Sequence, residues 1–388
     1  MKKYFLLLFL GSVSFILVSQ NKDIDSVLNL LKTAKQDTNH VKNLNNLSWY
    51  YMDEAKYDES LKYAQQALTL AKSVQYKQGE VIALSYIGLT YHLRNDFASA
   101  LNYYYQEQKE YETYDNKKSQ AKNLSNIGNV FSDKGDYIKA LDFYFQSLKI
   151  NETIKYREGI ASAYNNIGII YNYQGNYDKT LEFFFKALQI NTELKRQRGI
   201  VNALGNIGNI YYFQHKYSKA LEYQLKAMKM NEASGNKSAL SDNYGNIAIT
   251  YNDQSDADFI AQGLQPADRF KLSTEFSFKA LKLNEELKSQ YGITVNFLNI
   301  GAAYLKANKF TDAETYCLKG LTLAKTDGYL ELVKEGAQKL SDVYQNLSNQ
   351  KKALEYFKMY IISRDSLQNE ENTKKTVRLE MNYEFDKK

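Results

Sequence analysis

Proline is nearly absent from this chain of 388 residues, where Pro266 is the only one. Because a proline breaks the interior of a helix, its scarcity leaves almost the whole chain free to be helical. Cysteine is equally scarce, and the lone Cys317 excludes an intrachain disulfide, a cysteine-based zinc site and a lipoprotein anchor. The three histidines, His40, His92 and His215, stand at no metal-ligand spacing, so we predict no metal site.

The chain also lacks a strong excess of charge of one sign. Lysine and arginine number 50 against 44 aspartates and glutamates, and no basic cluster marks a nucleic-acid-binding surface. The phosphate-loop, zinc-protease and nucleophile-elbow motifs do not occur. Acidic pairs such as Glu285-Glu286 fit a polar helix surface better than a catalytic carboxylate pair. We therefore predict a protein that is no enzyme, has no catalytic residues, needs no cofactor and binds no nucleic acid.

Aromatic residues are abundant, with 34 tyrosines and 19 phenylalanines. This content is far above that of disordered or linker-rich chains, which bury little apolar surface. Together with the scarcity of proline, it favours an all-α fold whose long helices pack through aromatic side chains.

The first twenty residues have the three parts of a secretory signal peptide. Lys2 and Lys3 form a basic start, residues 4–18 are mostly apolar, and polarity begins at Ser19. We predict a signal peptide over residues 1–20, cleaved near Ser19 or Gln20. The alternative is an uncleaved membrane anchor, because about 15 to 17 apolar residues can just span a bilayer. Either reading places the rest of the chain in the periplasm or on the extracytoplasmic face of the inner membrane.

The chain repeats itself with a period of 40 residues. The phrase NLSNIG at residues 123–128 returns as AYNNIG at 163–168 and as ALGNIG at 203–208. Extending this register predicts eight repeats within residues 43–368, with one insertion at about residues 254–270. Their predicted starts lie near residues 43, 83, 123, 163, 203, 243, 296 and 336.

Each repeat position has a physical reason. A small residue, glycine in five repeats, occupies one position of the first helix, and a glycine there lets a second helix approach closely. An aromatic residue always follows three positions later, on the face that the 3.6-residue period gives to the core. A turn then contains residues that tolerate the left-handed conformation, namely Asn95, Gly135, Gly175, His215 and Asn308.

This pattern resembles the tetratricopeptide repeat (TPR), W-x2-L-G-x2-Y followed by A-x3-F. Residues 164–171 match its first half, and Thr180 with Phe184 matches its second half. The resemblance implies a right-handed superhelix, an α-solenoid of about eight helical hairpins. The chain departs from the family in its 40-residue period and in lacking the closing proline. Long-period variants of this kind resemble kinesin light chains and bacterial peptide-sensing regulators.

An asparagine series recurs at one position of the first helix, although asparagine is a mediocre helix former. In TPR domains this position faces the concave groove, where an amide can donate to and accept from an extended peptide backbone. The alternative is that these amides bond within the scaffold. The candidate groove residues are Asn46, Asn126, Asn166, Asn206, Asn246 and Asn299, with neighbours Asn129, Asn165, Asn172, Asn202, Asn209, Tyr212, Asp242 and Asn252.

The segments outside the repeats are short. Residues 21–42 are predicted to hold a capping helix, at residues 25–38, that covers the first repeat. The insertion is predicted to be a surface loop, with a binding element as the alternative. Residues 369–388 are predicted to be a C-terminal helical extension.

The C-terminal phrase suggests a function by resemblance. In bacterial sensor proteins a similar phrase leaves a TPR input region and leads into a coiled coil, a membrane helix and an output domain. The chain therefore resembles the extracytoplasmic input region of a signal-transduction protein that binds a protein or peptide. The alternative is a free-standing periplasmic scaffold or chaperone for envelope proteins. Membrane association could come from the N-terminal segment or from an output region beyond this chain.

Overall fold

The computed structural model describes residues 17–33 and 35–386. These residues form eighteen α-helices and one short 3-10 helix, and none of them is in a β-strand. The predicted all-α fold is therefore confirmed. The chain divides into two compact units, which are described separately. The described residues of the N-terminal unit are 17–33 and 35–194, and those of the C-terminal unit are 195–386.

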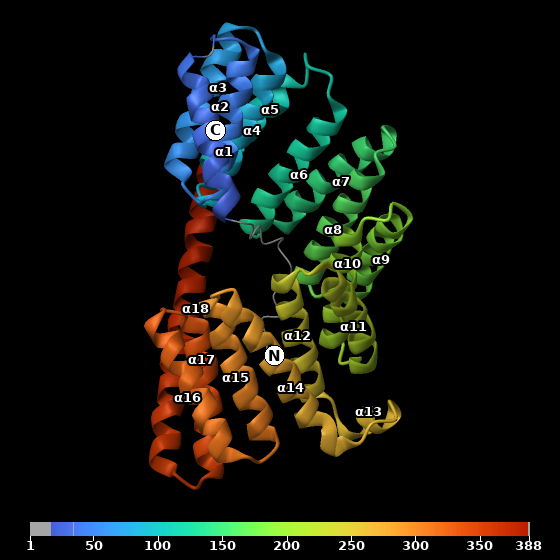
Figure 1. Ribbon diagram of the computed structural model, residues 1–388, viewed down its shortest axis with the longest axis vertical. Helices are drawn as coiled ribbons and strands as arrows, with labels where there is room; N and C mark the ends of the chain where they lie inside the picture. The colour runs from blue at the N-terminus through green and yellow to red at the C-terminus, as the bar shows by residue number, and fades with distance from the viewer. Residues whose placement is uncertain (1–16, 34, 387–388) are drawn as a thin grey trace. The chain divides into compact units, whose positions relative to one another are not determined.

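The helices of the N-terminal unit follow one another as antiparallel neighbours (Figure 1). They are α1 (Leu17–Thr33), α2 (Thr38–Asp53), α3 (Tyr57–Ser73), α4 (Lys77–Leu93), α5 (Phe97–Glu110), α6 (Lys117–Asp133), α7 (Tyr137–Thr153), α8 (Arg157–Tyr173) and α9 (Tyr177–Glu193).

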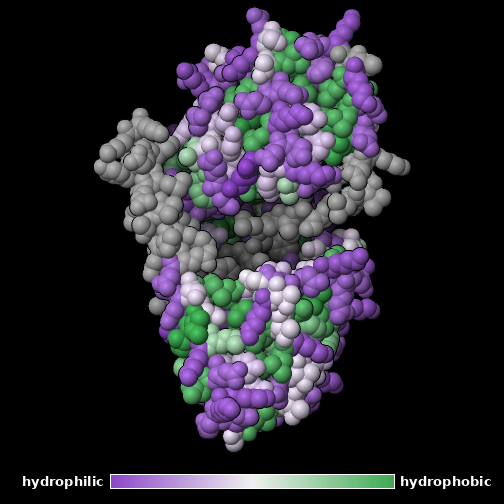
Figure 2. Space-filling view, turned by 90° about the vertical axis from the view of Figure 1, so that its left-hand side faces the viewer, coloured by the Kyte–Doolittle hydropathy of each residue, from purple (hydrophilic) through white to green (hydrophobic). Residues whose placement is uncertain are grey.

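The C-terminal unit continues the same alternation with one interruption. Its elements are α10 (Gln197–Phe213), α11 (Tyr217–Ser234), α12 (Lys237–Asp253), α13 (Asp256–Ala261), η1 (Pro266–Asp268), α14 (Arg269–Glu286), α15 (Gln290–Lys306), α16 (Phe310–Thr326), α17 (Leu330–Asn346) and α18 (Gln350–Asp386). On the side of the molecule drawn in Figure 2, hydrophilic side chains are interspersed with hydrophobic ones over each unit.

Eight hairpins account for sixteen of these helices. The first helix of each hairpin is called an A helix (α2, α4, α6, α8, α10, α12, α15, α17), and the second is called a B helix (α3, α5, α7, α9, α11, α14, α16, α18). Each predicted repeat start lies five or six residues inside its A helix. The offset arises because the repeat was counted from a phrase in the middle of that helix.

The interface between the A and B helices of a hairpin is called the seam, and the repeated glycine lies in it. A Cβ atom added to Gly168 would lie 2.7 Å from a ring carbon of Phe184 on the B helix, so glycine is required for this close approach. Beside it, the aromatic of each A helix stacks on an aromatic of its B helix. The stacked pairs are Tyr51–Tyr63, Tyr91–Tyr103, Phe131–Phe143, Tyr171–Phe183, Tyr211–Tyr223, Tyr251–Phe276, Tyr304–Tyr316 and Tyr344–Tyr356.

The turns within the hairpins follow the prediction. Asn95, Gly135, Gly175, His215 and Asn308 all have positive φ, between 57° and 75°. The turns from a B helix to the next A helix also use left-handed residues, and several of these are lysines, which carry no sequence signal for a turn. They include Lys155, Lys195 and Lys288, with φ of 54° to 55°.

The insertion is not a plain loop. It holds α13, which begins with a capping box formed by Ser255 and Asp258. Phe259 of this helix is fully buried, and its ring centroid lies 5.8 Å from that of Tyr251 on α12. The prediction of a surface loop missed this helix because Phe259 is the one residue that it buries, which is too few for a helical pattern of apolar residues.

The two flanks differ in detail from their predictions. The helix expected at residues 25–38 ends earlier, as α1 (Leu17–Thr33), and Asp37 caps the start of α2. The last B helix and the C-terminal extension form one helix, α18. Residues 1–16 of the predicted signal peptide lie outside the described residues. None of the described helices combines the length and the hydropathy needed to cross a bilayer.

Candidate functional site

The A helices of each unit contact one another in series, α2 to α8 in one unit and α10 to α17 in the other. Their surface on the side of the predicted groove residues is called the A face. On α12, for example, Asn246 and Asp253 share this face, because seven residues make two helical turns. The A face therefore collects side chains from consecutive repeats into one row per unit.

The predicted groove residues differ in exposure. In the N-terminal unit Asn46 is exposed, and the half-buried ones are Asn126, Asn129, Asn165, Asn166 and Asn172. In the C-terminal unit the half-buried ones are Asn202, Asn246, Asn252 and Asn299, and the buried ones are Asn206, Asn209 and Tyr212.

At least four of these residues interact with the protein itself, namely Asn129, Asn165, Asn206 and Tyr212. Asn129 accepts a hydrogen bond from the hydroxyl of Tyr144 at 2.7 Å, and that ring fills the space beside Gly128 in the seam. Tyr212 donates to Asp253 at 2.5 Å. For Asn129 and Tyr212, the alternative that these side chains bond within the scaffold therefore applies.

Other A-face amides have polar atoms that the fold does not use. Among the described residues, Asn209 Oδ1, Asn252 Oδ1 and Asn299 Nδ2 are buried and have no hydrogen-bond partner. They come from the consecutive A helices α10, α12 and α15. Asn252 offers an acceptor and Asn299 a donor, which are the two functions that a peptide unit needs opposite its N–H and C=O groups.

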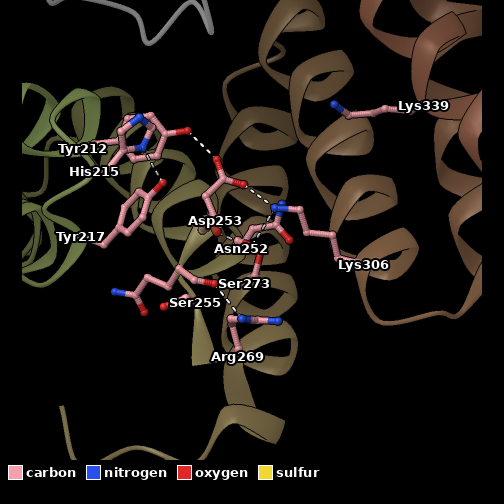
Figure 3. A network of polar contacts seen from close by, with 12 residues as sticks. Tyr212, His215, Tyr217, Asn252, Asp253, Ser255, Arg269, Ser273, Lys306 and Lys339 are labelled. Atoms are coloured by element: carbon pink, nitrogen blue, oxygen red, sulfur yellow. Dashed lines mark hydrogen bonds and ion pairs between the residues drawn. The ribbon is translucent and has the colours of Figure 1, made fainter. Parts of the chain in front are cut away.

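A polar network joins the same three helices (Figure 3). Asp253 on α12 accepts from Tyr212 on α10 and is ion-paired with Lys306 on α15, at 2.7 Å. Lys306 Nζ also donates to the backbone carbonyl of Asn252 at 3.0 Å. The network fixes three neighbouring A helices at one end of the A face.

Sequence reasoning missed Asp253 and Lys306. A signal was present, since the position that corresponds to Asp253 three repeats earlier is also an aspartate, Asp133. In the N-terminal unit Asp133 lies 2.7 Å from His92 Nε2 on the preceding A helix. Polar contacts made by an aspartate between consecutive A helices thus occur in both units.

A second asparagine series was also missed, and it belongs to the scaffold. Asn123 donates to the carbonyl of Tyr104 at 2.9 Å, and Asn191 to that of Ala187 at 2.9 Å. Asn231 donates to Asn243 at 2.6 Å, and Asn296 to the carbonyl of Gly292 at 2.8 Å. All five asparagines are buried. The scaffold use of asparagine is therefore real, but it falls mainly on positions other than the predicted ones.

The ionisable groups of the C-terminal unit have the following states. Burial raises the pKa of the Cys317 thiol to about 12, so it is not a thiolate at neutral pH. Burial also raises the pKa of Asp242, on the A face of α12, to about 6. Among the described residues, no three His, Cys, Asp or Glu side chains gather as metal ligands would. Amides, a carboxylate and a paired lysine can bind a polypeptide through hydrogen bonds and charge.

Family models support the repeat assignment. A model described as tetratricopeptide repeat matches residues 119–193 and 159–233, and a second with the same description matches residues 44–74. No curated protein sequence matches the chain.

Solved structures with similar folds include proteins described as sensors and regulators. The chain is similar to a signal transduction ATPase with a tetratricopeptide repeat sensor from Pyrococcus horikoshii, with 17% identity and a TM-score of 0.64 over 95% of this chain and 56% of that one. It is similar to the apo quorum sensor NprR from B. thuringiensis, with 14% identity and a TM-score of 0.60 over 89% of this chain and 98% of that one.

A third similar structure contains a peptide. It is the Rap conjugation gene regulator of the plasmid pLS20 in complex with the Phr* peptide, with 10% identity and a TM-score of 0.53 over 90% of this chain and 96% of that one. At these identities the likeness shows the fold alone. Taken with the family models and the hairpin seam present in all eight repeats, it leads to one assignment: this chain is a tetratricopeptide-repeat protein.

Proposed function

We propose that this chain is a non-catalytic scaffold that binds an extended peptide or polypeptide segment along the A face. The observation that carries the proposal is the contrast between the two asparagine series. Each scaffold asparagine uses at least one amide atom in a hydrogen bond, as Asn123 does although its Oδ1 is unpaired, whereas the side chains of Asn252 and Asn299 make no hydrogen bond with any described residue. An unpaired buried polar atom costs stability, so its retention favours a role in binding.

The chemistry of the A face suits a peptide backbone. An extended chain exposes N–H and C=O groups that need partners, and side-chain amides provide both kinds. The likeness to the Rap regulator in complex with the Phr* peptide supports the same reading, although only at the level of the fold.

We further propose that the protein works outside the cytoplasm, as the input region of a signal-transduction protein. The basic, apolar and polar order of residues 1–20 supports export. N-terminal sequencing of protein from cell fractions tests this part: a mature start near Gln20 or Asn21 in the periplasm is expected. Intact Met1 on protein from the cytosol would contradict it.

The binding proposal is tested with a random twelve-residue peptide library displayed on phage. Wild-type protein is expected to enrich peptides, and the best of them is synthesised for affinity measurements. In the variant with Asn246, Asn252 and Asn299 all replaced by alanine, its affinity should fall about tenfold to a thousandfold. This range follows from one hydrogen bond per asparagine at roughly 0.5–1.5 kcal/mol each.

The matched control replaces Gln189, Thr192 and Thr326 by alanine, since these exposed polar side chains lie on B helices. The control should bind the peptide as wild type does. Equal loss of affinity in both variants, or no enrichment by wild-type protein, would contradict the proposal.

A further inference from the structure

Asp242 lies on the A face of α12. It stands eleven residues before Asp253, which is three helical turns, so the two carboxylates lie on the same side of the helix. Asp253 reaches Tyr212 on α10 and Lys306 on α15, as Figure 3 shows. Asp242 therefore lies on the same side of α12 as these contacts with the neighbouring A helices.

Asp242 differs from the other charged groups on this part of the A face. Asp253 and Lys306 neutralise each other at 2.7 Å, and so do Lys339 and Glu335. Asp242 is half-buried, yet it has no hydrogen bond and no ion pair with any described residue. The fold therefore leaves one carboxylate on this surface without a counter-charge.

The energetics of Asp242 are unfavourable for the isolated protein. Burial alone raises its pKa to about 6, and among the described residues no charged group of α10, α11, α14 or α15 acts on it. A carboxyl with a raised pKa binds its proton more tightly in the folded state. Stability therefore falls as pH rises between about 4 and 6, and at neutral pH the ionised group is a net cost to folding.

Nearby side chains are polar and uncharged. Asn246 lies one turn further along α12, and Asn202 occupies the position on α10 that corresponds to Asp242. A ligand that lies across these residues meets amides for its backbone and a single negative charge. An asparagine at position 242 would give a neutral surface and avoid the free-energy cost of burying a charge. The presence of a carboxylate there therefore favours a ligand of opposite charge.

We propose that Asp242 is a specificity-determining residue, which pairs with an ammonium or guanidinium group of the bound peptide. The proposal rests on the peptide-binding function proposed above and adds the class of ligand, a peptide with a cationic group in the register of Asp242. The cation can be a lysine or arginine side chain or the peptide's own N-terminal amine.

The test compares selections from the phage-displayed random twelve-residue library. Full-length wild-type protein, Asp242→Asn and Glu275→Gln each select peptides in parallel. Glu275 is an exposed carboxylate on α14 that is already paired with Lys279, so it serves as the matched control. Pools from wild type and Glu275→Gln should be enriched in lysine and arginine, or should require a free N-terminus. The pool from Asp242→Asn should show neither preference.

Affinities of the best wild-type peptide give a second readout. Asp242→Asn should bind it at least about tenfold more weakly at pH 7.5, the equivalent of about 1.4 kcal/mol. Wild-type affinity should fall from pH 7.5 to pH 5 as the carboxyl takes up its proton, and Asp242→Asn should lack this component. Replacing the basic residue by norleucine, or acetylating the N-terminus, identifies which cation is recognised.

The two proposals fail in different ways. Enrichment of peptides by wild type without any cationic preference, or with the same preference in Asp242→Asn, overturns the role of Asp242 alone. No enrichment by wild type overturns both. A melting temperature of Asp242→Asn no lower than that of wild type at pH 7.5 is expected, which separates a role in binding from a role in folding.

Discussion

Two glycines three residues apart on α10 contrast the seam with the A face. A Cβ atom on Gly208 would lie 2.8 Å from Gln224 Cγ and 3.2 Å from the carbonyl oxygen of Ala220, both on the B helix. A Cβ atom on Gly205 would meet no atom within 4 Å. The same residue type is thus required for packing at one position and is unconstrained at the other. Packing in the seam determines the fold. Residues of the A face are not under this packing constraint, so they can serve binding.

Overpacking of the seam should give the largest effect. Gly168→Leu forces a branched side chain against Phe184, whose ring already lies where a Cβ would be. We expect a loss of about 3 kcal/mol or more in the free energy of unfolding, at the upper end of overpacking effects. Chemical denaturation measures it, and a neutral result would show that the helices do not approach as closely as described.

The seam also holds a buried carboxylate, Glu107 on α5, at a position that is small in the other repeats before the last, namely Ala67, Ser147, Ala187, Ala227, Ala280 and Gly320. Burial raises its pKa to about 8, even though Tyr111 donates to it at 2.9 Å and Ser85 and Lys122 act in the opposite direction. Tyr104 lies one turn before it on the same helix. Glu107 is therefore a buried acid that folds in its protonated form.

The sign of the resulting pH dependence follows from linkage. Because the folded state holds the proton more tightly, stability should fall as pH rises from about 4.5 to about 8. The slope from this one group reaches at most roughly 1.4 kcal/mol per pH unit. Glu107→Gln should remove this slope while Glu275→Gln, on an exposed surface, should keep it. Denaturation midpoints measured between pH 5 and pH 8 test this expectation. If stability falls with pH as steeply in Glu107→Gln as in wild type, Glu107 is not the source of the pH dependence.

Replacing the two glycines of α10 by alanine should give smaller changes in stability, and the two changes should have opposite signs. Gly205→Ala should stabilise the protein by about 0.5–1 kcal/mol, because alanine is the better helix former and its methyl group has space. Gly208→Ala should destabilise it, since the carbonyl of Ala220 is backbone and cannot move aside cheaply. If both variants shift the melting temperature in the same direction, the contrast between seam and A face does not hold.

The sequence predicts the seam better than the A face, for a physical reason. The repeated glycine, the aromatic three residues later and the turn residues such as Asn95 each satisfy a local steric demand, and steric demands restrict residue type. Hydrogen bonding restricts it less, because an asparagine can bond to the scaffold, as Asn123 does, or remain available, as Asn299 does. The ion pair of Asp253 with Lys306 joins residues from two repeats that the insertion separates, so the 40-residue period could not reveal it.

The central claim is that A-face asparagines serve binding while scaffold asparagines serve folding, and thermal unfolding of two matched double variants tests it most directly. Asn252→Ala with Asn299→Ala removes two amides that each hold a buried unpaired atom. Asn231→Ala with Asn296→Ala removes two buried amides that donate to Asn243 and to the carbonyl of Gly292. The account predicts an unchanged or higher melting temperature for the first variant and a loss of about 1–3 kcal/mol per site for the second. Equal destabilisation of both variants would contradict it.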